Sequence, residues 1–255
     1  MSAESQCSSA SIHNMNHCVE PELLDALPPE DAAARRSRQD LSRLNSLMQH
    51  GRIVAQALTA ACARCPPQRI VDLGAGDGSF MLGLARELAW RWQTVDVVLV
   101  DRQKILQEAT RWGFRELGWN CEPVQADAFD WLTHSELCSS DCIVANLFLH
   151  HFAEPGLRRL LMLAAARVSS FVACEPRRTP AVLTASRCLG LIGCNRVTRH
   201  DAIVSVRAGF LDHELSRLWP SVREWKVVER EAGLFSHLFV ATRATCGQGP
   251  TPLPQ

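Results

Sequence analysis

The chain has 255 residues, of which 47% are hydrophobic and 21% charged, and its 27 basic residues balance its 27 acidic residues. This length and composition fit one α/β domain with an appendage. A neutral chain without a long cationic run argues against a nucleic acid as the main partner, and no apolar stretch is long enough to predict a membrane span.

The N-terminal part divides into a polar segment and a helical one. The first 30 residues contain five acids and no lysine or arginine, so we expect a disordered tail. Residues 31–66 predict a helical cap, because apolar residues recur at helical spacing on both sides of Gly51. Asp31 is the expected N-cap residue of the first helix in this segment. The pattern fits either two helices or one helix kinked near Gly51.

A strand, a glycine-rich turn and a helix then follow one another. Residues 69–73 form an apolar run with Asp72 inside it, and residues 79–91 continue as an amphipathic helix. Between them lie Gly74, Gly76 and Gly78, which allow a sharp reversal and the close approach of a ligand to the backbone. This is the first unit of a nucleotide-binding α/β domain.

The ligand of this turn is not expected to be a dinucleotide. The spacing Gly-x-Gly-x-Gly differs from the dinucleotide pattern Gly-x-Gly-x-x-Gly. Asp77 lies among the glycines, where its carboxylate would repel a pyrophosphate. An acid there suits a ligand that carries a positive charge and no phosphate.

Two further strands are predicted downstream of the turn. Residues 95–101 read as a buried strand ending in Asp101, followed by a helix over residues 103–117. An acid at the end of the second strand can accept hydrogen bonds from a ribose diol, although Asp101 could instead cap the next helix. A short strand over residues 122–126 precedes Asp127.

The second half of the domain continues the alternation. We expect strands at 141–146 and 170–175, separated by a helix from Pro155 to about residue 167. Alternating strands and helices indicate a parallel sheet covered on both faces. Ligands of such sheets bind beyond the carboxyl ends of the strands. One site should therefore collect the residues at those ends, namely Asp72, Asp101, Asp127, Asn146 and Glu175.

The C-terminal region changes pattern twice. Residues 177–220 are predicted to be a helical lid insertion, with helices over 181–192 and 212–219. Residues 225–243 read as two strands joined at Ala232-Gly233, which predicts a terminal antiparallel hairpin. The main domain would thus span residues 67–243, and residues 244–255 would form a loose tail.

The cysteines indicate a reducing compartment. The chain has eleven, an odd number with scattered spacing, and several lie in apolar strand runs, where a thiol behaves as a small hydrophobe. We therefore expect a cytoplasmic protein, and the N-terminus lacks the basic and apolar regions of a secretory signal. Cys62 and Cys65 have no second pair or histidines at ligand spacing, so no metal site is predicted.

The motifs together resemble a known family. Residues 72–78, Asp101, residues 126–128 and residues 141–147 resemble the four successive motifs of class I S-adenosylmethionine-dependent methyltransferases. The resemblance implies an α/β fold with a seven-stranded, mostly parallel Rossmann-like sheet that ends in an antiparallel hairpin, and it implies S-adenosylmethionine as cofactor. The N-terminal helices would either cover the cofactor or only shield a face of the sheet.

The resemblance also assigns roles to residues. Asp127 would accept a hydrogen bond from the adenine amino group, and the backbone amide of Ala128 would bond the adenine ring. The expected cofactor-binding residues are Asp72, Gly74, Ala75, Gly76, Asp101, Arg102, Asp127, Ala128, Asn146 and Leu147. Two histidines just past the fourth strand, His150 and His151, are candidate catalytic bases because histidine titrates in the right pH range. Either could instead bond the backbone or contact the cofactor.

The expected activity is methyl transfer to a small molecule. The lid insertion favours a small acceptor. Residues 146–149 are Asn-Leu-Phe-Leu, whereas methyltransferases that modify exocyclic amines have an Asn/Asp-Pro-Pro-aromatic motif at this place. More loosely, residues 198–210 and 225–241 resemble methyltransferases encoded beside type III polyketide synthases. An oxygen of a phenol, enol or polyketide-like molecule is therefore the expected acceptor. A protein or RNA methyltransferase and a non-catalytic cofactor-binding module remain the alternatives, and the oligomeric state is open.

Overall fold

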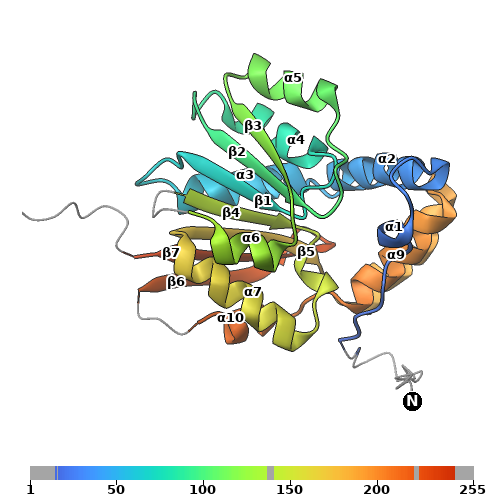
Figure 1. The fold of residues 1–255 in the computed structure, drawn as a ribbon. Helices are drawn as coiled ribbons and strands as arrows, with labels where there is room; N and C mark the ends of the chain where they lie inside the picture. The colour runs from blue at the N-terminus through green and yellow to red at the C-terminus, as the bar shows by residue number, and fades with distance from the viewer. Residues whose placement is uncertain (1–14, 16, 137–140, 221–223, 245–255) are drawn as a thin grey trace, which may run out of the picture.

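The fold is built on one seven-stranded sheet with the order β3-β2-β1-β4-β5-β7-β6 (Figure 1). The structure is a computed structural model and describes residues 15, 17–136, 141–220 and 224–244. Strands β1 to β5 run parallel, and β7 runs antiparallel to both β5 and β6. The predicted parallel sheet with a terminal hairpin is confirmed. The strands are β1 (Arg69–Leu73), β2 (Asp96–Asp101), β3 (Asn120–Gln125), β4 (Asp141–Asn146), β5 (Ser170–Pro176), β6 (Trp225–Ala232) and β7 (Ser236–Arg243).

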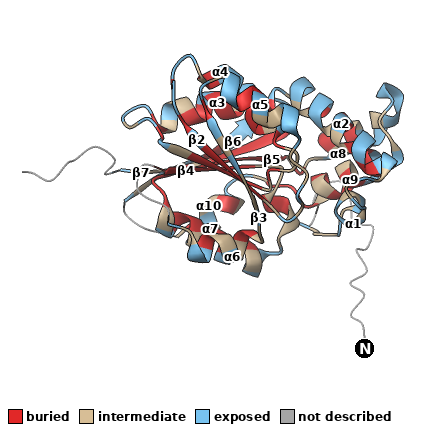
Figure 2. Ribbon diagram, turned by 45° about the horizontal axis from the view of Figure 1, so that its top comes forward, coloured by how far each residue is buried: buried red, intermediate tan, exposed pale blue. Residues whose placement is uncertain are grey.

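Helices cover both faces of the sheet, as Figure 2 shows. Successive strand residues point to opposite faces, so Ile70 packs into one core and Val71 into the other. The first core is closed by α3 (His50–Ala61), α4 (Ser79–Leu88) and α5 (Glu108–Glu116). The second is closed by α6 (Ala128–His134), α7 (Glu154–Arg167) and α10 (Glu214–Leu218). Two covered faces explain why the central strands are continuous apolar runs.

A third group of helices lies beyond the carboxyl ends of the strands (Figure 1). Within this group, Asn195 donates its backbone N–H to Asp40 at 2.8 Å, and the hydroxyls of Thr198 and Ser37 lie 2.9 Å apart. The N-terminal segment and the insertion therefore pack together over the same end of the sheet. The elements are α1 (Leu23–Ala26), α2 (Ala32–Leu47), α8 (Pro180–Arg187), the 3₁₀ helix η2 (Cys188–Ile192) and α9 (Arg196–Arg207).

The N-terminal helices serve two purposes. Two helices form rather than one kinked helix, because Gln49 between them adopts a left-handed conformation with φ of 57°. Helix α3 shields a face of the sheet, whereas α2 faces the ligand end with Arg38, Leu41 and Ser42. Both possibilities left open by the sequence therefore apply, each to a different helix.

Some element boundaries differ from the expectation. The helix predicted from residue 103 begins only at Glu108, because the Asp101 carboxylate accepts the N–H of Gln103 at 2.7 Å and turns the chain. In the insertion, α9 covers Arg196–Arg207, a stretch for which no helix was predicted. Helix α10 packs on the second core of the sheet rather than over its carboxyl end.

The prediction of a disordered tail over residues 1–30 is wrong for its second half. The backbone N–H groups of Leu23 and Leu24 donate to the carboxylate of Asp201 at 2.8 and 3.0 Å. This carboxylate lies on α9 and satisfies the first turn of α1, a partner that local composition cannot reveal. Residues 1–14 and 16, and the predicted tail over 245–255, lie outside the described residues. Within the described ranges, no helix is long and apolar enough to cross a membrane.

Candidate functional site

A cleft of about 670 Å³ opens at the carboxyl ends of the parallel strands. It lies where the strand order reverses between β1 and β4, the position at which open α/β sheets bind ligands. Its walls come from α2, from the segment around α1 and from the loops that follow β1, β2, β3 and β4. All ten expected cofactor-binding residues line it, namely Asp72, Gly74, Ala75, Gly76, Asp101, Arg102, Asp127, Ala128, Asn146 and Leu147.

The glycine turn needs glycine for two different reasons. Gly74, Gly76 and Gly78 all have positive φ, at 75°, 56° and 73°. A Cβ on Gly74 would lie 2.3 Å from the ring of Phe148, so the position is also sterically closed. A Cβ on Gly76 would meet nothing within 4 Å, so the backbone there is open for a ligand to approach.

Asp101 holds the turn in place while it faces the cleft. One carboxylate oxygen accepts the N–H of Gly76 at 2.8 Å, and the other accepts the N–H of Gln103 at 2.7 Å. Each carboxylate oxygen has two lone pairs, so both keep one for a further donor such as a ribose hydroxyl. The two roles weighed from the sequence, local cap and ligand acceptor, are thus compatible.

Asp72 is a buried carboxyl group on the wall of the cleft. It is only 2% exposed, and burial, helped by the negative charge of Asp101, raises its pKa to about 8. A positively charged ligand in the cleft would stabilise the ionised form of this group. The site therefore offers a specific place for a cationic group.

The loop after β3 presents a third acid. Asp127 caps α6, because its carboxylate accepts the N–H of Phe129 at 2.9 Å. Its other oxygen lies 3.4 Å from Nε of Arg102, whose side chain is 81% exposed. Ala128 follows as a buried residue at the start of the helix. The exposed partner leaves Asp127 accessible from the cleft.

The loop after β4 carries local strain and an unpaired polar atom. Leu147 has φ of 54°, a costly conformation for a residue with a Cβ and one that clusters at functional sites. The buried side-chain oxygen of Asn146 has no hydrogen bond of good geometry, although the side chain lies close enough to His50 to raise the pKa of that imidazole. Leu147 and Asn146 line the cleft, where a ligand donor could satisfy the oxygen.

The two histidines of the 3₁₀ helix η1 (Leu149–His151) have different surroundings. His151 lines the cleft, and its Nδ1 lies 3.6 Å from the carboxylate of Asp25. His150 is buried behind it, with Nδ1 2.7 Å from Glu175 and Nε2 3.3 Å from Glu22. The imidazole rings stack with centroids 4.4 Å apart. Of the two candidate bases, the structure brings only His151 to the cleft wall.

The carboxylates around His150 determine its protonation. Burial alone would lower the pKa of His150, but the hydrogen bonds and charges of Glu175 and Glu22 outweigh it and raise that pKa to about 10. The same pairing, against burial, lowers the pKa of Glu22 to about 2. Without another cation, His150 is therefore an imidazolium between two carboxylates. An imidazolium cannot accept a proton from a substrate.

Sequence reasoning missed Glu22 as a site residue and left Glu175 without a role. Glu175 is fully buried and accepts the N–H groups of Phe148 and Leu149 at 3.0 and 2.8 Å, so it organises the loop after β4. Its place at a strand end was the signal that could have identified it. Glu22 lies 128 residues from its partner His150, in a segment whose composition indicated disorder, and it gave no such signal.

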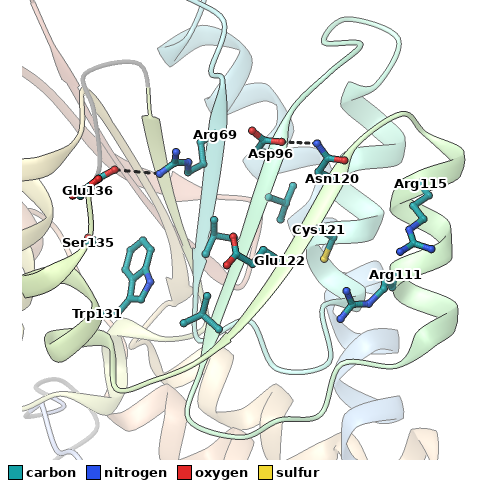
Figure 3. A pocket seen from close by; sticks show the side chains of 13 residues that line it. Arg69, Asp96, Arg111, Arg115, Asn120, Cys121, Glu122, Trp131, Ser135 and Glu136 are labelled. Atoms are coloured by element: carbon teal, nitrogen blue, oxygen red, sulfur yellow. Dashed lines mark hydrogen bonds between the residues drawn. The ribbon is translucent and has the colours of Figure 1, made fainter.

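A second cavity, of about 600 Å³, lies at the opposite end of the strands. Figure 3 shows two hydrogen bonds among its lining residues: Arg69 donates to the backbone of Glu136 at 3.2 Å, and Asn120 donates to Asp96 at 2.8 Å. Its lining comes from the first three strands, from α5 and α6 and from the residues that follow α6, away from the glycine turn. The two cavities have similar volumes, so chemistry and position single out the cleft at the carboxyl ends.

Comparison with known proteins shows similarity to methyltransferases. Residues 70–169 match a family model described as a methyltransferase domain. No curated protein matches the chain. A solved O-methyltransferase family protein from Burkholderia thailandensis shares 17% identity, with a TM-score of 0.56 over 86% of this chain. The chain spans only 62% of the length of that protein.

Two other solved structures share the fold. The plantazolicin methyltransferase BpumL, in complex with SAH, is 12% identical, with a TM-score of 0.59 over 84% of this chain and 91% of its own. A putative O-methyltransferase from Nostoc punctiforme is 13% identical, with a TM-score of 0.54 over 82% of this chain and 60% of its own.

Proposed function

Because residues 70–169 match a methyltransferase-domain model and the strand-end motifs resemble those of class I S-adenosylmethionine-dependent methyltransferases, we propose that the chain methylates a hydroxyl oxygen of a small phenolic, enolic or polyketide-like molecule. The observation that carries the proposal is the single cleft at the carboxyl ends of the strands, which joins every expected cofactor residue to His151. A cofactor held along the first three strand ends would present its methyl group toward the loop after β4.

The cofactor contacts follow from the chemistry of each wall. The open backbone of Gly76 admits the ligand, the free lone pairs of Asp101 accept from the ribose diol, and Asp127 accepts from the adenine amino group. Asp72 faces the cationic part, where a methionine ammonium group would compensate its buried charge. A phosphate is disfavoured, because acids on the wall outnumber the arginines Arg38 and Arg102.

The acceptor end of the cleft favours a planar apolar molecule with an oxygen. Phe148 and Phe152 line it and form an edge-to-face pair with centroids 5.1 Å apart, a surface suited to an aromatic or enolic ring. His151 stands beside them as the nearest expected group for the acceptor oxygen. Methyl transfer from a sulfonium is an in-line displacement, so such positioning contributes much of the rate. The O-methyltransferase names of the Burkholderia and Nostoc proteins agree with an oxygen acceptor.

Two features make a macromolecular acceptor the weaker alternative. The wall that would face a nucleic acid carries several carboxylates, including Glu20, Glu22 and Asp25, which repel phosphates. Helix α2 and the segment around α1 also form part of the wall at the strand ends, which suits a small molecule. We place the reaction in the cytoplasm, because cysteines such as Cys142 and Cys174 occupy strand interiors as buried thiols. A place in secondary metabolism follows from the proposed polyketide-like acceptor.

Calorimetry tests the cofactor assignment. S-adenosylmethionine is titrated into the wild type, Asp101→Ala and the control Asp96→Ala. Asp96 is an exposed residue at the other end of the same strand, so its loss should leave the affinity unchanged. We expect Asp101→Ala to bind at least tenfold more weakly, since a charge-assisted hydrogen bond contributes about 1.5–3 kcal/mol. Equal affinity in all three proteins would rule out the ribose role of Asp101.

The acceptor is identified by transfer of a labelled methyl group. Enzyme and labelled cofactor are incubated with panels of phenols, enolic pyrones and primary amines, and products are resolved by mass spectrometry. Labelled oxygen ethers with wild type, and a loss of roughly 10²–10⁴-fold with His151→Asn, are expected if His151 serves proton removal. Labelling confined to amines would contradict an oxygen acceptor.

A further inference from the structure

Three side chains at the acceptor end of the cleft form a constellation that cofactor binding does not use. Glu22 from the N-terminal segment and His150 and His151 from η1 each place a ligand atom within 4.8 Å of the other two. Nε2 of His150 and an oxygen of Glu22 are 3.3 Å apart. Ligand atoms bound to one tetrahedral zinc ion at about 2.0–2.1 Å lie about 3.3 Å from each other. This pair is therefore already at metal-ligand spacing.

The buried Glu175 orients one of these ligands. Its carboxylate accepts a hydrogen bond from Nδ1 of His150 at 2.7 Å. The same carboxylate is held in place because it also accepts the backbone N–H groups of Phe148 and Leu149. The other nitrogen, Nε2, is thereby aimed at Glu22. A histidine that ligates a metal usually donates its remaining N–H to a carboxylate in this way. The position of Glu175 thus provides a second observation, independent of the three ligand atoms.

The third ligand is free to complete the set. The side chain of His151 is 25% exposed and lines the cleft, and its ligand atom lies within 4.8 Å of those of Glu22 and His150, so His151 is the member of the set that adjusts when the ion binds. Asp25 lies 3.6 Å from Nδ1 of His151 and adds a further carboxylate beside the group. Two imidazoles and one carboxylate are a ligand set for zinc or ferrous iron that leaves a coordination position open.

We propose that Glu22, His150 and His151 bind one divalent first-row transition-metal ion, and that the acceptor oxygen takes the open position on that ion. The inference deepens the proposed function and rests on it for the identity of the acceptor. It also explains how an acceptor oxygen becomes anionic beside Glu22 and Asp25, where an unaccompanied phenolate would be repelled. A divalent ion that displaces the single proton on Nε2 of His150 adds one net positive charge beside these carboxylates.

The step balances without another reactant. Metal binding displaces the Nε2 proton of His150 to solvent, since the ligating nitrogen of an imidazole must be unprotonated. Coordination then lowers the pKa of the acceptor hydroxyl, whose proton leaves to solvent. The oxygen forms a bond to the cofactor methyl carbon, the carbon–sulfur bond breaks, and its electron pair returns to sulfur. In this form His151 acts as a ligand rather than as a free base.

No local pattern in the sequence predicts this set. Its ligands come from two segments that lie 128 positions apart at Glu22 and His150, and the only spacing that suggested a metal was that of Cys62 and Cys65. Those cysteines also complicate a binding test, because thiolates take the same metals. Cobalt(II) separates the two cases, since bound thiolates give intense near-ultraviolet charge-transfer absorption and histidine and carboxylate ligands give weak visible bands.

The test measures cobalt(II) binding to chelator-treated full-length protein, without cofactor or acceptor. The wild type is compared with Glu22→Gln, His151→Asn and Glu175→Gln. The control is His134→Asn, which removes an exposed histidine on α6. We expect one equivalent with visible bands in the wild type and the control. Affinity should fall at least tenfold in the two ligand variants and roughly 10–100-fold in Glu175→Gln. Circular dichroism confirms that each variant is folded.

The outcomes separate this inference from the proposed function. Binding that is absent in the wild type, unchanged in Glu22→Gln and His151→Asn, or marked by thiolate absorption overturns the metal site. Any of these results leaves methyl transfer standing, with His151 acting directly. Conversely, the protein could bind cobalt in a way that depends on Glu22 and His151 and yet transfer no methyl group to any phenol or enol. That result would sustain the metal site and refute the acceptor class.

Discussion

At the scale of single residues, the acids of the cleft bind backbone groups with the same carboxylates that face the ligand. Asp101 accepts from Gly76 and Gln103, and Asp127 caps α6 through Phe129. Such carboxylates are held in one orientation before a ligand arrives, so binding does not pay for ordering them. Asp72 is positioned by burial rather than by such bonds, and its ionisation is therefore the property that a ligand changes most.

Asp72 makes the affinity for S-adenosylmethionine depend on pH. Its pKa in the free protein is raised to about 8 by burial and by Asp101, and a bound ammonium group would lower it. The ligand then prefers the ionised form, so affinity should rise with pH between about 6 and 7.5, by up to tenfold per pH unit. Above that range, loss of the ligand's own amino proton opposes the gain.

The variant Asp72→Asn isolates this effect. It cannot ionise, so its affinity should be weaker and nearly flat over the same pH interval. Calorimetry at half-unit steps measures both proteins, and Asp96→Asn, at the exposed start of β2, is the matched control that should follow the wild type. A wild-type affinity that does not change from pH 6 to 7.5 would show that Asp72 is already ionised or does not contact the charged part of the ligand.

The glycines of the chain give a paired prediction on stability. Gly74→Ala places a Cβ at positive φ and 2.3 Å from the ring of Phe148, so we expect a loss of at least about 1–2 kcal/mol. Gly83→Ala, in the middle of α4 with nothing within 4 Å of the new Cβ, should gain about 0.5–1 kcal/mol. Urea unfolding measures both. Equal effects would mean that the turn relaxes around Gly74.

At the scale of elements, the N-terminal segment depends on the insertion for its order. Helix α1 has four residues and no buried side chain of its own, so it cannot be stable alone. Its first turn is held by Asp201 on α9, while Glu22 bonds Ser205 on the same helix. The segment that supplies a wall of the cleft is therefore assembled only when α9 is in place.

Asp201→Ala should release this segment without unfolding the sheet. Two hydrogen bonds to a charged group are lost, so amide exchange around Leu23 and Leu24 should accelerate roughly tenfold or more. Amides of β4 and β5 should keep their protection. Hydrogen–deuterium exchange with mass spectrometry reads both regions, and Asp130→Ala on the exposed face of α6 is the control. Unchanged exchange at residues 20–27 would mean that other contacts hold α1.

The contrast between β4 and α1 shows what sequence can predict here. Apolar strands, glycine turns and strand-end acids encode their structure within a few residues. The parallel sheet with its terminal hairpin, and the ten predicted residues that line the cleft, therefore followed from local patterns and a family resemblance. Helix α1 and the pair of Glu22 with His150 depend on partners more than a hundred residues away. No local pattern reports such a contact. The start of α5 was missed because one side-chain bond, from Gln103 to Asp101, redirects the chain.

At the scale of the whole molecule, buried titratable groups make the stability of the fold depend on the pH of the solution. His50 begins α3, is 1% exposed, and has Nε2 2.7 Å from the hydroxyl of Ser236 on β7. Burial lowers its pKa to about 4, against the raising effects of Asn146 and Glu175. It therefore stays neutral in the folded protein at pH values where it is protonated in the unfolded chain.

This difference destabilises the fold in acid. Between the unfolded pKa of 6.5 and the folded value of about 4, the unfolded state binds the extra proton, so stability falls as the pH falls. The contribution is fully present above pH 6.5, and about 3 kcal/mol of it is lost by pH 4. Asp72 and His150 act in the opposite direction, since their raised pKa values mean that the folded state binds the extra proton.

Subtraction of a variant isolates the contribution of His50. His50→Gln keeps a donor for Ser236 but cannot ionise in this range, whereas Asp72 and His150 are the same in both proteins and cancel. The free energy of unfolding of the wild type minus that of His50→Gln should therefore fall by about 3 kcal/mol from pH 7 to pH 4. The same difference taken with Gln39→Ala, which changes an exposed residue on α2 that cannot ionise, should stay nearly constant. Because ligand-free protein is used throughout, a flat His50 curve would mean that water or a shift of α3 lets the protonated ring remain in the fold.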